Sequence, residues 1–368
     1  MIYLDHAATT PMSHAAIEKM LAVSKDIFGN PSSTHAYGRA AAALLREARQ
    51  TIASAIHAKP SQIIFTSGGT EANNTAIRGA VHKASGNHII TSSIEHHSVL
   101  HTMEALEKEG FEVTYLDPEK GLIQPSQVQA ALRPTTCLVS IMSANNETGA
   151  LMPISEIGAV LSEHPALFHV DAVQALGKID IDVDRDQVDF LSVSAHKIHG
   201  PKGVGFLYAR ENNFQPLLLG GDQEDKRRAG TENLTGIAAM AEAVKEQVAR
   251  VDENEQKVKA LRNRLLGGLP HGRFYINEPA TSLPYVVNLG FPGWSNELLL
   301  MRLDLAGIAV STGSACTAGA IEPSHVLTAM YGPDSPRLTE SIRISLSDMT
   351  TEEEIDQFLE TIKEIIGE

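Results

Sequence analysis

One lysine of the sequence stands where a chemical reaction could be carried out. Lys197 lies in a short polar loop between two apolar runs, at 188–193 and 203–208, which predict buried strands. Loops mounted on a rigid sheet often carry catalytic side chains. Lys197 is therefore either a surface lysine before the turn at Gly200-Pro201 or a Schiff-base lysine, whose amine becomes nucleophilic when its pKa is lowered.

The two cysteines of the chain have different surroundings. Cys137 opens an apolar run and is expected to be a small buried hydrophobic residue. Cys316 lies among glycine, serine, threonine and alanine residues at 311–320, and nothing nearby would bury it. An exposed thiol is a liability unless it is used. We interpret Cys316 as a candidate nucleophile and keep an unreactive loop position as the alternative.

Polar clusters follow several of the predicted strands. Besides the Lys197 loop they are Ile94-Glu95-His96-His97, Ser143-Ala144-Asn145-Asn146-Glu147-Thr148-Gly149 and Asp171-Ala172-Val173-Gln174. A single cluster would be a turn, but four clusters placed alike at the ends of strands predict a common pocket. A glycine turn at 67–71, between a strand and a helix, is typical of a phosphate site, although many such turns bind nothing.

The elements that must position these residues alternate along the chain. The sequence predicts strands at 62–66, 88–91, 112–116, 137–142 and 167–170, with helices between them. This pattern favours an α/β protein with a mostly parallel sheet covered by helices on both faces. One long helix is expected at 234–266, followed by a smaller α+β unit. The predicted domains are a large domain at 13–255 and a small domain formed by 1–12 and 256–368, which carries the cysteine loop at 311–322.

The composition limits the classes of protein to consider. A net charge of −15 gives no electrostatic basis for general nucleic-acid binding. Two distant cysteines form neither a disulfide framework nor a zinc site, so no metal is expected, and they suit a reducing compartment. The sequence shows neither a signal peptide nor an apolar run long enough to span a membrane. We therefore expect a cytoplasmic protein.

With these residues assembled, the chain resembles the cysteine desulfurases. These pyridoxal-phosphate enzymes have the aspartate aminotransferase-like fold (fold type I) and convert L-cysteine to L-alanine and an enzyme-bound persulfide. The resemblance covers essentially the whole chain. It rests on the motifs Tyr3-Leu4-Asp5-His6-Ala7-Ala8-Thr9-Thr10, Phe28-Gly29-Asn30-Pro31-Ser32-Ser33, Thr66-Ser67-Gly68-Gly69-Thr70-Glu71, Glu95-His96, Asn145-Asn146-Glu147-Thr148-Gly149, His169-Val170-Asp171-Ala172-Val173-Gln174, His196-Lys197, Arg228-Ala229-Gly230-Thr231, Gly313-Ser314-Ala315-Cys316-Thr317 and Ser341-Ile342-Arg343-Ile344-Ser345-Leu346.

The resemblance implies roles around the cofactor ring. Lys197 would bind pyridoxal phosphate covalently, and Asp171 would pair with the pyridinium nitrogen. Gln174 and Asn146 would form hydrogen bonds on the side of the ring's phenolic oxygen. His96 would stack on the ring and move protons.

The resemblance also implies the contacts of the phosphate and the substrate. Gly69, Thr70, Ser194 and His196 would hold the phosphate, and Thr231 would reach it from the other subunit of a homodimer. Arg343 would bind the carboxylate of L-cysteine, with Asn30 as a weaker candidate. Cys316 would attack the substrate sulfur, hold the persulfide and pass the sulfur to an acceptor protein by exchange.

Two rival functions and two acceptors remain open at this stage. A selenocysteine lyase or aminotransferase would share the fold, and a non-catalytic sulfur carrier would use it only for docking. The acceptor would belong either to iron–sulfur cluster assembly or to tRNA thiolation. Iron–sulfur members of the family carry a C-terminal tail after the last helix, whereas this sequence ends at Gly367-Glu368. The loop from Gly220 to Thr231 also resembles the shorter branch of the family, some members of which supply sulfur to tRNA-thiolating enzymes. The resemblance therefore favours tRNA thiolation.

Overall fold

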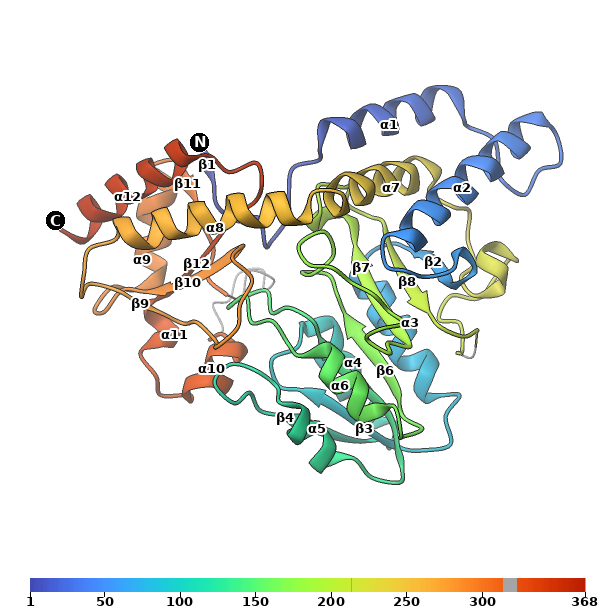
Figure 1. Cartoon of the computed structure of the whole chain (residues 1–368), viewed down its shortest axis with the longest axis horizontal. Helices are drawn as coiled ribbons and strands as arrows, with labels where there is room; N and C mark the ends of the chain where they lie inside the picture. Colours follow the sequence, from blue (N-terminus) through green and yellow to red (C-terminus); the bar gives the residue numbers. More distant parts are fainter. Residues whose placement is uncertain (213, 314–322, 368) are drawn as a thin grey trace.

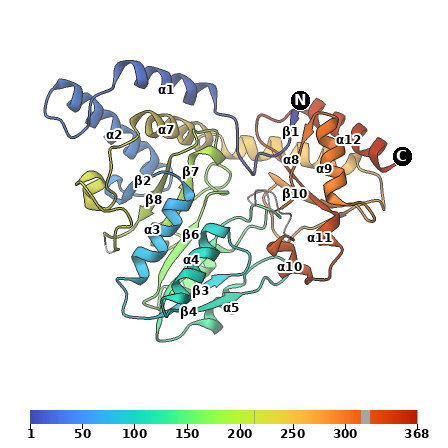
Figure 2. The ribbon, with the colours of Figure 1, turned by 180° about the vertical axis from the view of Figure 1, so that it is seen from behind.

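Two lobes joined by a long helix make up the computed structural model, which describes residues 1–212, 214–313 and 323–367 (Figure 1). The larger lobe contains a seven-stranded sheet and the smaller lobe contains both labelled termini. The reverse view shows the same division, with α8 crossing between the lobes (Figure 2). The predicted domains, 13–255 and 1–12 with 256–368, stay a prediction.

The large sheet is mostly parallel, as predicted. Only β8 runs antiparallel to its two neighbours, β2 and β7. The remaining strands therefore end at the same edge of the sheet, where the polar clusters follow β3, β5, β6 and β7. In spatial order the strands are β2 (Ile63–Thr66), β8 (Gly205–Ala209), β7 (Phe190–Ser194), β6 (Leu167–Asp171), β5 (Thr136–Met142), β3 (His88–Ser92) and β4 (Glu112–Leu116).

Both faces of this sheet are buried, because neighbouring residues of a strand point to opposite sides. On β3, Ile89 belongs to the apolar core under α3 and α4, while Ile90 belongs to the larger core on the other face. Leu138 and Val139 of β5 divide in the same way. Continuous apolar runs, rather than alternating ones, are the sequence signature of such strands, and this explains why the prediction succeeded.

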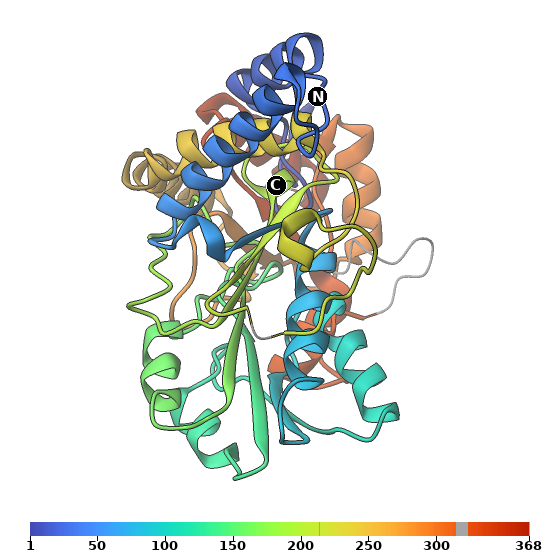
Figure 3. The same cartoon turned by 90° about the vertical axis from the view of Figure 1, so that its right-hand side faces the viewer.

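Helices surround the large sheet (Figure 3). Helices α1 and α2 pack against α7, and α3 packs against α4 and against β7 and β8. Ser13 caps the first helix, because its hydroxyl accepts a hydrogen bond from the N–H of Ala16 (3.2 Å). The bounds are α1 (His14–Asp26), α2 (Ala36–Ser54), α3 (Gly69–Val81), α4 (His97–Lys108), α5 (Pro125–Ala131), α6 (Ile154–Leu161) and α7 (Leu234–Val248).

The smaller lobe is built from both ends of the chain. Its sheets are β12-β10-β9 and the parallel pair β1-β11, so the N-terminal strand lies on residues some 300 positions later. The bounds are β1 (Ile2–Tyr3), β9 (Tyr275–Ile276), β10 (Val286–Gly290), β11 (Ile308–Ala309), β12 (Ser341–Ser345), α8 (Val251–Gly268), α9 (Asn296–Leu305), α10 (His325–Tyr331), α11 (Arg337–Glu340) and α12 (Glu352–Ile366).

The prediction of one helix from 234 to 266 is wrong. The chain forms α7 and α8, with a break at Ala249-Arg250, where Arg250 leaves helical geometry (φ −122°, ψ 18°). Buried side chains bridge the break, since Asn254 donates to Gln247 (3.2 Å) and Gln247 donates to Asp348 (3.4 Å). No glycine or proline marks this position in the sequence. Within the described residues, no helix combines the length and apolar character that crossing a membrane requires.

Candidate active site

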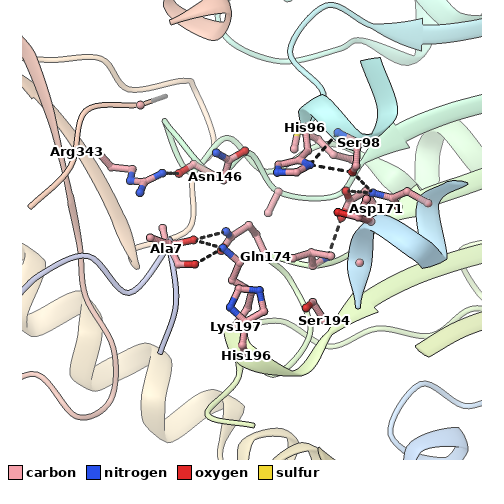
Figure 4. Close-up of a pocket in the computed structure, with 18 residues that line it drawn as sticks. Ala7, His96, Ser98, Asn146, Asp171, Gln174, Ser194, His196, Lys197 and Arg343 are labelled. Carbon is pink, nitrogen blue, oxygen red and sulfur yellow. Dashed lines mark hydrogen bonds between the residues drawn. The ribbon is translucent and has the colours of Figure 1, made fainter. Parts of the chain in front are cut away.

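The polar clusters at the ends of the parallel strands meet at one cavity, and residues of the smaller lobe close it (Figure 4). Its volume is about 370 Å³. The pocket predicted from the four clusters is therefore present. The lining residues are Ala7, Ala8, Gly69, Thr70, Asn73, His96, Ser98, Met142, Ala144, Asn146, Asp171, Val173, Gln174, Ser194, His196, Lys197, Gly313 and Arg343.

Lys197 reaches this cavity from a short 3₁₀ helix, η2 (Ala195–Lys197), directly after β7. Its Nζ donates hydrogen bonds to the carbonyl oxygens of Ala7 (2.5 Å) and Ala8 (2.7 Å). Lys197 is the one lysine among the lining residues. Of the two interpretations of Lys197, the structure favours the pocket lysine over the surface lysine.

Asp171 ends β6 and is almost completely buried. Its two carboxylate oxygens are held separately: Oδ2 accepts from Asn73 Nδ2 (2.8 Å) and Oδ1 accepts from the backbone N–H of Val173 (3.0 Å). A fixed carboxylate at the wall of a pocket can pair with a cationic ring nitrogen.

His96 lies across the cavity from Lys197, in the loop before α4 (Figure 4). Its Nδ1 accepts a hydrogen bond from the backbone N–H of Ser98 (3.1 Å) and lies 2.8 Å from the Ser98 hydroxyl. Burial lowers the pKa of His96, which keeps the imidazole neutral near pH 7. With Nδ1 occupied as an acceptor, the proton of the neutral ring is on Nε2.

An anion site is formed where α3 begins. The residue before this helix, Gly68, has φ +148° and no side chain caps the helix, so its first N–H groups are open to a ligand. A Cβ atom on Gly69 would lie 2.7 Å from Val173, which explains the glycine. Ser194 and His196 line the cavity as well. Burial, together with the charge of Lys197, lowers the pKa of His196 to about 4, so this imidazole is neutral.

Arg343 projects from β12 into the opposite side of the cavity. Its side chain is 2% exposed; Nη2 donates to Asp5 (2.8 Å) and Nη1 donates to the backbone oxygen of Asn146 (3.0 Å). Its Nε is buried and has no hydrogen-bond partner in the described part of the chain. Gln174 also lines the cavity, and its Nε2 donates to the Ala7 oxygen (2.9 Å).

Two of the predicted site residues are not part of this arrangement. Thr231 and Asn30 are exposed and lie together in a separate groove, formed by 24–31 and 231–235. The predictions that Asn30 contacts the substrate and that Thr231 acts in a second subunit stay untested. Cys316 lies outside the described residues, but Gly313, the last described residue before it, lines the cavity.

The sequence analysis missed several residues that shape the cavity. Ser98 and Asn73 orient His96 and Asp171, and both lie on helix faces where the sequence gives no sign of a polar role. Glu95 is fully buried, and burial raises its pKa to about 8. Its Oε1 accepts hydrogen bonds from Ser92 (2.5 Å) and from the backbone of Met142 (3.0 Å). The sequence signal that could have identified Glu95 was its position directly before His96 in the Glu95-His96 motif.

Known proteins are similar to this sequence along almost its whole length. Residues 2–358 match the family model of class-V aminotransferases. The chain is 50% identical to a Bacillus subtilis (strain 168) protein assigned as cysteine desulfurase IscS 1, covering 99% of this chain and 98% of the relative. It is 45% identical to cysteine desulfurase IscS of Dictyoglomus turgidum, covering 99% and 94%. The chain belongs to the cysteine desulfurase family.

Solved structures agree with this assignment. A NifS-like protein superimposes on this desulfurase with a TM-score of 0.93 at 36% identity, covering 99% of each chain. A structure described as SspA in complex with cysteine has a TM-score of 0.83 at 37% identity, covering 95% of this chain and all of the other. The predicted fold type is thereby confirmed.

The family's cofactor, pyridoxal phosphate, fits the residues of this desulfurase's cavity. The N–H groups at the uncapped start of α3 could bind the phosphate of the cofactor. The buried carboxylate of Asp171 could pair with its ring nitrogen, and the amine of Lys197 could bond to its carbonyl carbon. These three groups line one cavity of about 370 Å³. The desulfurase is therefore a pyridoxal-phosphate enzyme.

Proposed function

We propose that this desulfurase converts L-cysteine to L-alanine in the cavity described above and collects the sulfur as a persulfide on Cys316. The observation that carries the proposal is the convergence of Lys197, Asp171 and Arg343 on the cavity that Gly313, three residues before Cys316, also lines. A lysine, a buried carboxylate and a carboxylate-binding arginine are the groups that an amino-acid substrate requires.

When bound, pyridoxal phosphate withdraws electrons from the Cα atom of the substrate. Asp171 supports this by pairing with the ring nitrogen, and Asn73 and Val173 hold its oxygens in place. The start of α3, with Gly69 and Thr70, anchors the phosphate. Ser194 and His196 complete the phosphate site within one chain, while Asn146 and Gln174 lie on the phenolic oxygen side.

Lys197 and His96 are the groups that move protons. The Lys197 amine would take the proton from the substrate Cα, since it lines the same cavity as the other site residues. His96 would lie against the cofactor ring, and its Nε2–H would donate toward the reacting atoms because Nδ1 already accepts from Ser98. Burial keeps this imidazole neutral, so it can give and take a proton near neutral pH.

Cys316 then removes the sulfur. Its thiolate attacks the sulfur of the substrate, so that an S–S bond forms and the substrate's Cβ–S bond breaks, with its electron pair remaining on the carbon fragment that leaves as alanine. The persulfide passes to an acceptor thiol. We infer that the acceptor is a cytoplasmic tRNA-thiolating enzyme, with an iron–sulfur scaffold as the alternative, and that the protein itself contacts no nucleic acid.

A homodimer is the proposed working form. Thr231 is exposed, does not line the cavity of its own chain, and shares a groove with the exposed Phe28 (70%). Leu217, Leu218 and Leu219 precede this loop and are also exposed, Leu219 to 84%. An exposed apolar surface of this kind suits contact with a second copy, in which Thr231 would reach the partner's phosphate site.

Arg343→Lys is expected to raise the KM for L-cysteine by about tenfold or more and to change kcat less. Lysine keeps the positive charge but loses the planar fork, which holds Asp5, Asn146 and a substrate carboxylate at once. Steady-state kinetics of alanine formation measure the effect. An unchanged KM would show that the substrate carboxylate is bound elsewhere, and Asn30→Ala would be the next variant to test.

The proposed function is tested with purified holoenzyme, L-cysteine and a thiol reductant. Alanine and sulfide should form in equal amounts. Without reductant, mass spectrometry should find one extra sulfur atom on the peptide that contains Cys316. Alanine or pyruvate without this modification would indicate a lyase or aminotransferase. A protein that binds no cofactor and forms no alanine would be a sulfur carrier.

A further inference from the structure

A second lysine, Lys178, lies next to the cavity. Its Nζ donates a hydrogen bond to Gln174 Oε1 (3.1 Å) and lies 5.5 Å from the centre of the Tyr285 ring. Lys178 and Lys197 line the same small space behind the cavity. Asp348, which also lines this space, is paired with His199 instead (2.9 Å). Within the described residues, Lys178 donates its hydrogen bond to the Gln174 oxygen.

The contact with Lys178 decides which way the Gln174 amide faces. An amide has an oxygen that only accepts hydrogen bonds and an NH₂ group that only donates them. Since Lys178 donates to the oxygen, the NH₂ group must point the other way. It donates to the Ala7 oxygen (2.9 Å), the same atom to which Lys197 donates (2.5 Å). A chain of hydrogen bonds therefore joins Lys178 to Lys197 through Gln174.

The reverse orientation of the amide would fail on both sides. The NH₂ group of Gln174 would face the Lys178 amine, and its oxygen would face the Ala7 oxygen at hydrogen-bond distance, where two acceptors repel. Burial, reinforced by the charge of Lys197, lowers the pKa of Lys178 to about 7. Both the charged and the neutral amine carry N–H groups, so the contact with the Gln174 oxygen persists across this pKa.

We propose that Lys178 is a positioning residue that holds the Gln174 amide with its donor face toward the cofactor. Gln174 is buried and lines the cavity, and its second N–H is available for an acceptor oxygen there. The inference rests on the proposed function, because the acceptor would be the phenolic oxygen of pyridoxal phosphate. Lys178 contributes without contacting the cofactor itself.

A double-mutant cycle on cofactor binding tests the proposal. Lys178→Met, Gln174→Ala and the double variant are compared by titrating apoenzyme with pyridoxal phosphate and recording the visible absorption band. Each single variant should weaken cofactor binding by about tenfold and displace the band, because one hydrogen bond to a charged oxygen is lost. The double variant should bind like Gln174→Ala. Fully additive losses would overturn the proposal.

Two further variants keep the test sharp. Lys202→Met removes an exposed lysine near the same site and should leave the band and the affinity unchanged. Gln174→Glu keeps an acceptor oxygen for Lys178 but has no side-chain N–H donor, so this variant should bind the cofactor as weakly as Gln174→Ala. If Gln174→Glu bound the cofactor with wild-type affinity, the proposal would be overturned, even if Lys178→Met failed to fold. These readouts need no substrate, so they are independent of whether the holoenzyme desulfurates cysteine.

Discussion

Replacing Lys197 by alanine should lower the rate of alanine formation by at least about a thousandfold. In the proposed function Lys197 supplies both the amine that binds the cofactor and the base that takes the Cα proton, and no other lysine lines the cavity among the described residues. Added amines cannot reproduce its position, because its Nζ is held by the oxygens of Ala7 and Ala8. The effect is measured as the rate of alanine formation by the variant after reconstitution with pyridoxal phosphate, at a saturating concentration of L-cysteine.

Borohydride reduction provides an independent check on Lys197. In the wild type it should fix the cofactor on the peptide that contains Lys197, and in Lys197→Ala the cofactor should remain removable by dialysis. Lys202→Ala is the matched control and should behave as the wild type, since Lys202 is exposed and does not line the cavity. Covalent cofactor on another lysine would contradict the assignment of Lys197.

Replacing Cys316 by alanine should reduce sulfide formation at least about a hundredfold and abolish the persulfide, because the attack on sulfur requires a thiolate. Cofactor binding should be retained, since none of the residues assigned to the ring or the phosphate is changed. Sulfide and alanine are measured together after addition of L-cysteine. Undiminished alanine formation in this variant would indicate that the protein is a lyase or an aminotransferase instead.

Cys137→Ala is the matched control for Cys316→Ala. Cys137 lies in β5, is 5% exposed and donates through its thiol to the His88 oxygen (3.3 Å). Burial raises the pKa of this thiol, so it is not a nucleophile near neutral pH. The control variant should retain the persulfide and nearly the full activity. Loss of the persulfide together with loss of cofactor binding in Cys137→Ala would point to a folding defect instead.

The large sheet and most of the cavity were predictable from the sequence for a physical reason. Buried parallel strands require continuous apolar runs, and ligand-binding residues must follow their carboxyl ends. Asp171, His96 and Lys197 therefore stand out directly after such runs. Motif resemblance then supplied roles that spacing alone could not, such as the substrate contact of Arg343, which lies 146 residues after Lys197 in the chain.

The parts that escaped prediction depend on contacts between distant segments. The break between α7 and α8 is bridged by Gln247, Asn254 and Asp348, none of which disturbs the local helical pattern. The oxygens of Ala7 and Ala8 are backbone atoms, which any residue would supply. Lys178 looks like an ordinary charged residue after a glycine, and only the folded chain places its amine on Gln174.

The pairing of β1 with β11 also bears on the order in which the protein matures during synthesis. The segment that carries Asp5, Ala7 and Ala8 leaves the ribosome long before β12, yet Asp5 meets Arg343 of β12 across a separation of 338 residues. Contacts of such long range are slow to form, because closing a long loop costs conformational entropy. The segment before α1 can pair with β11 and contact β12 only after both strands have been translated. The nascent enzyme therefore has a complete cavity, which Ala7, Ala8 and Arg343 all line, only after β12 has been made.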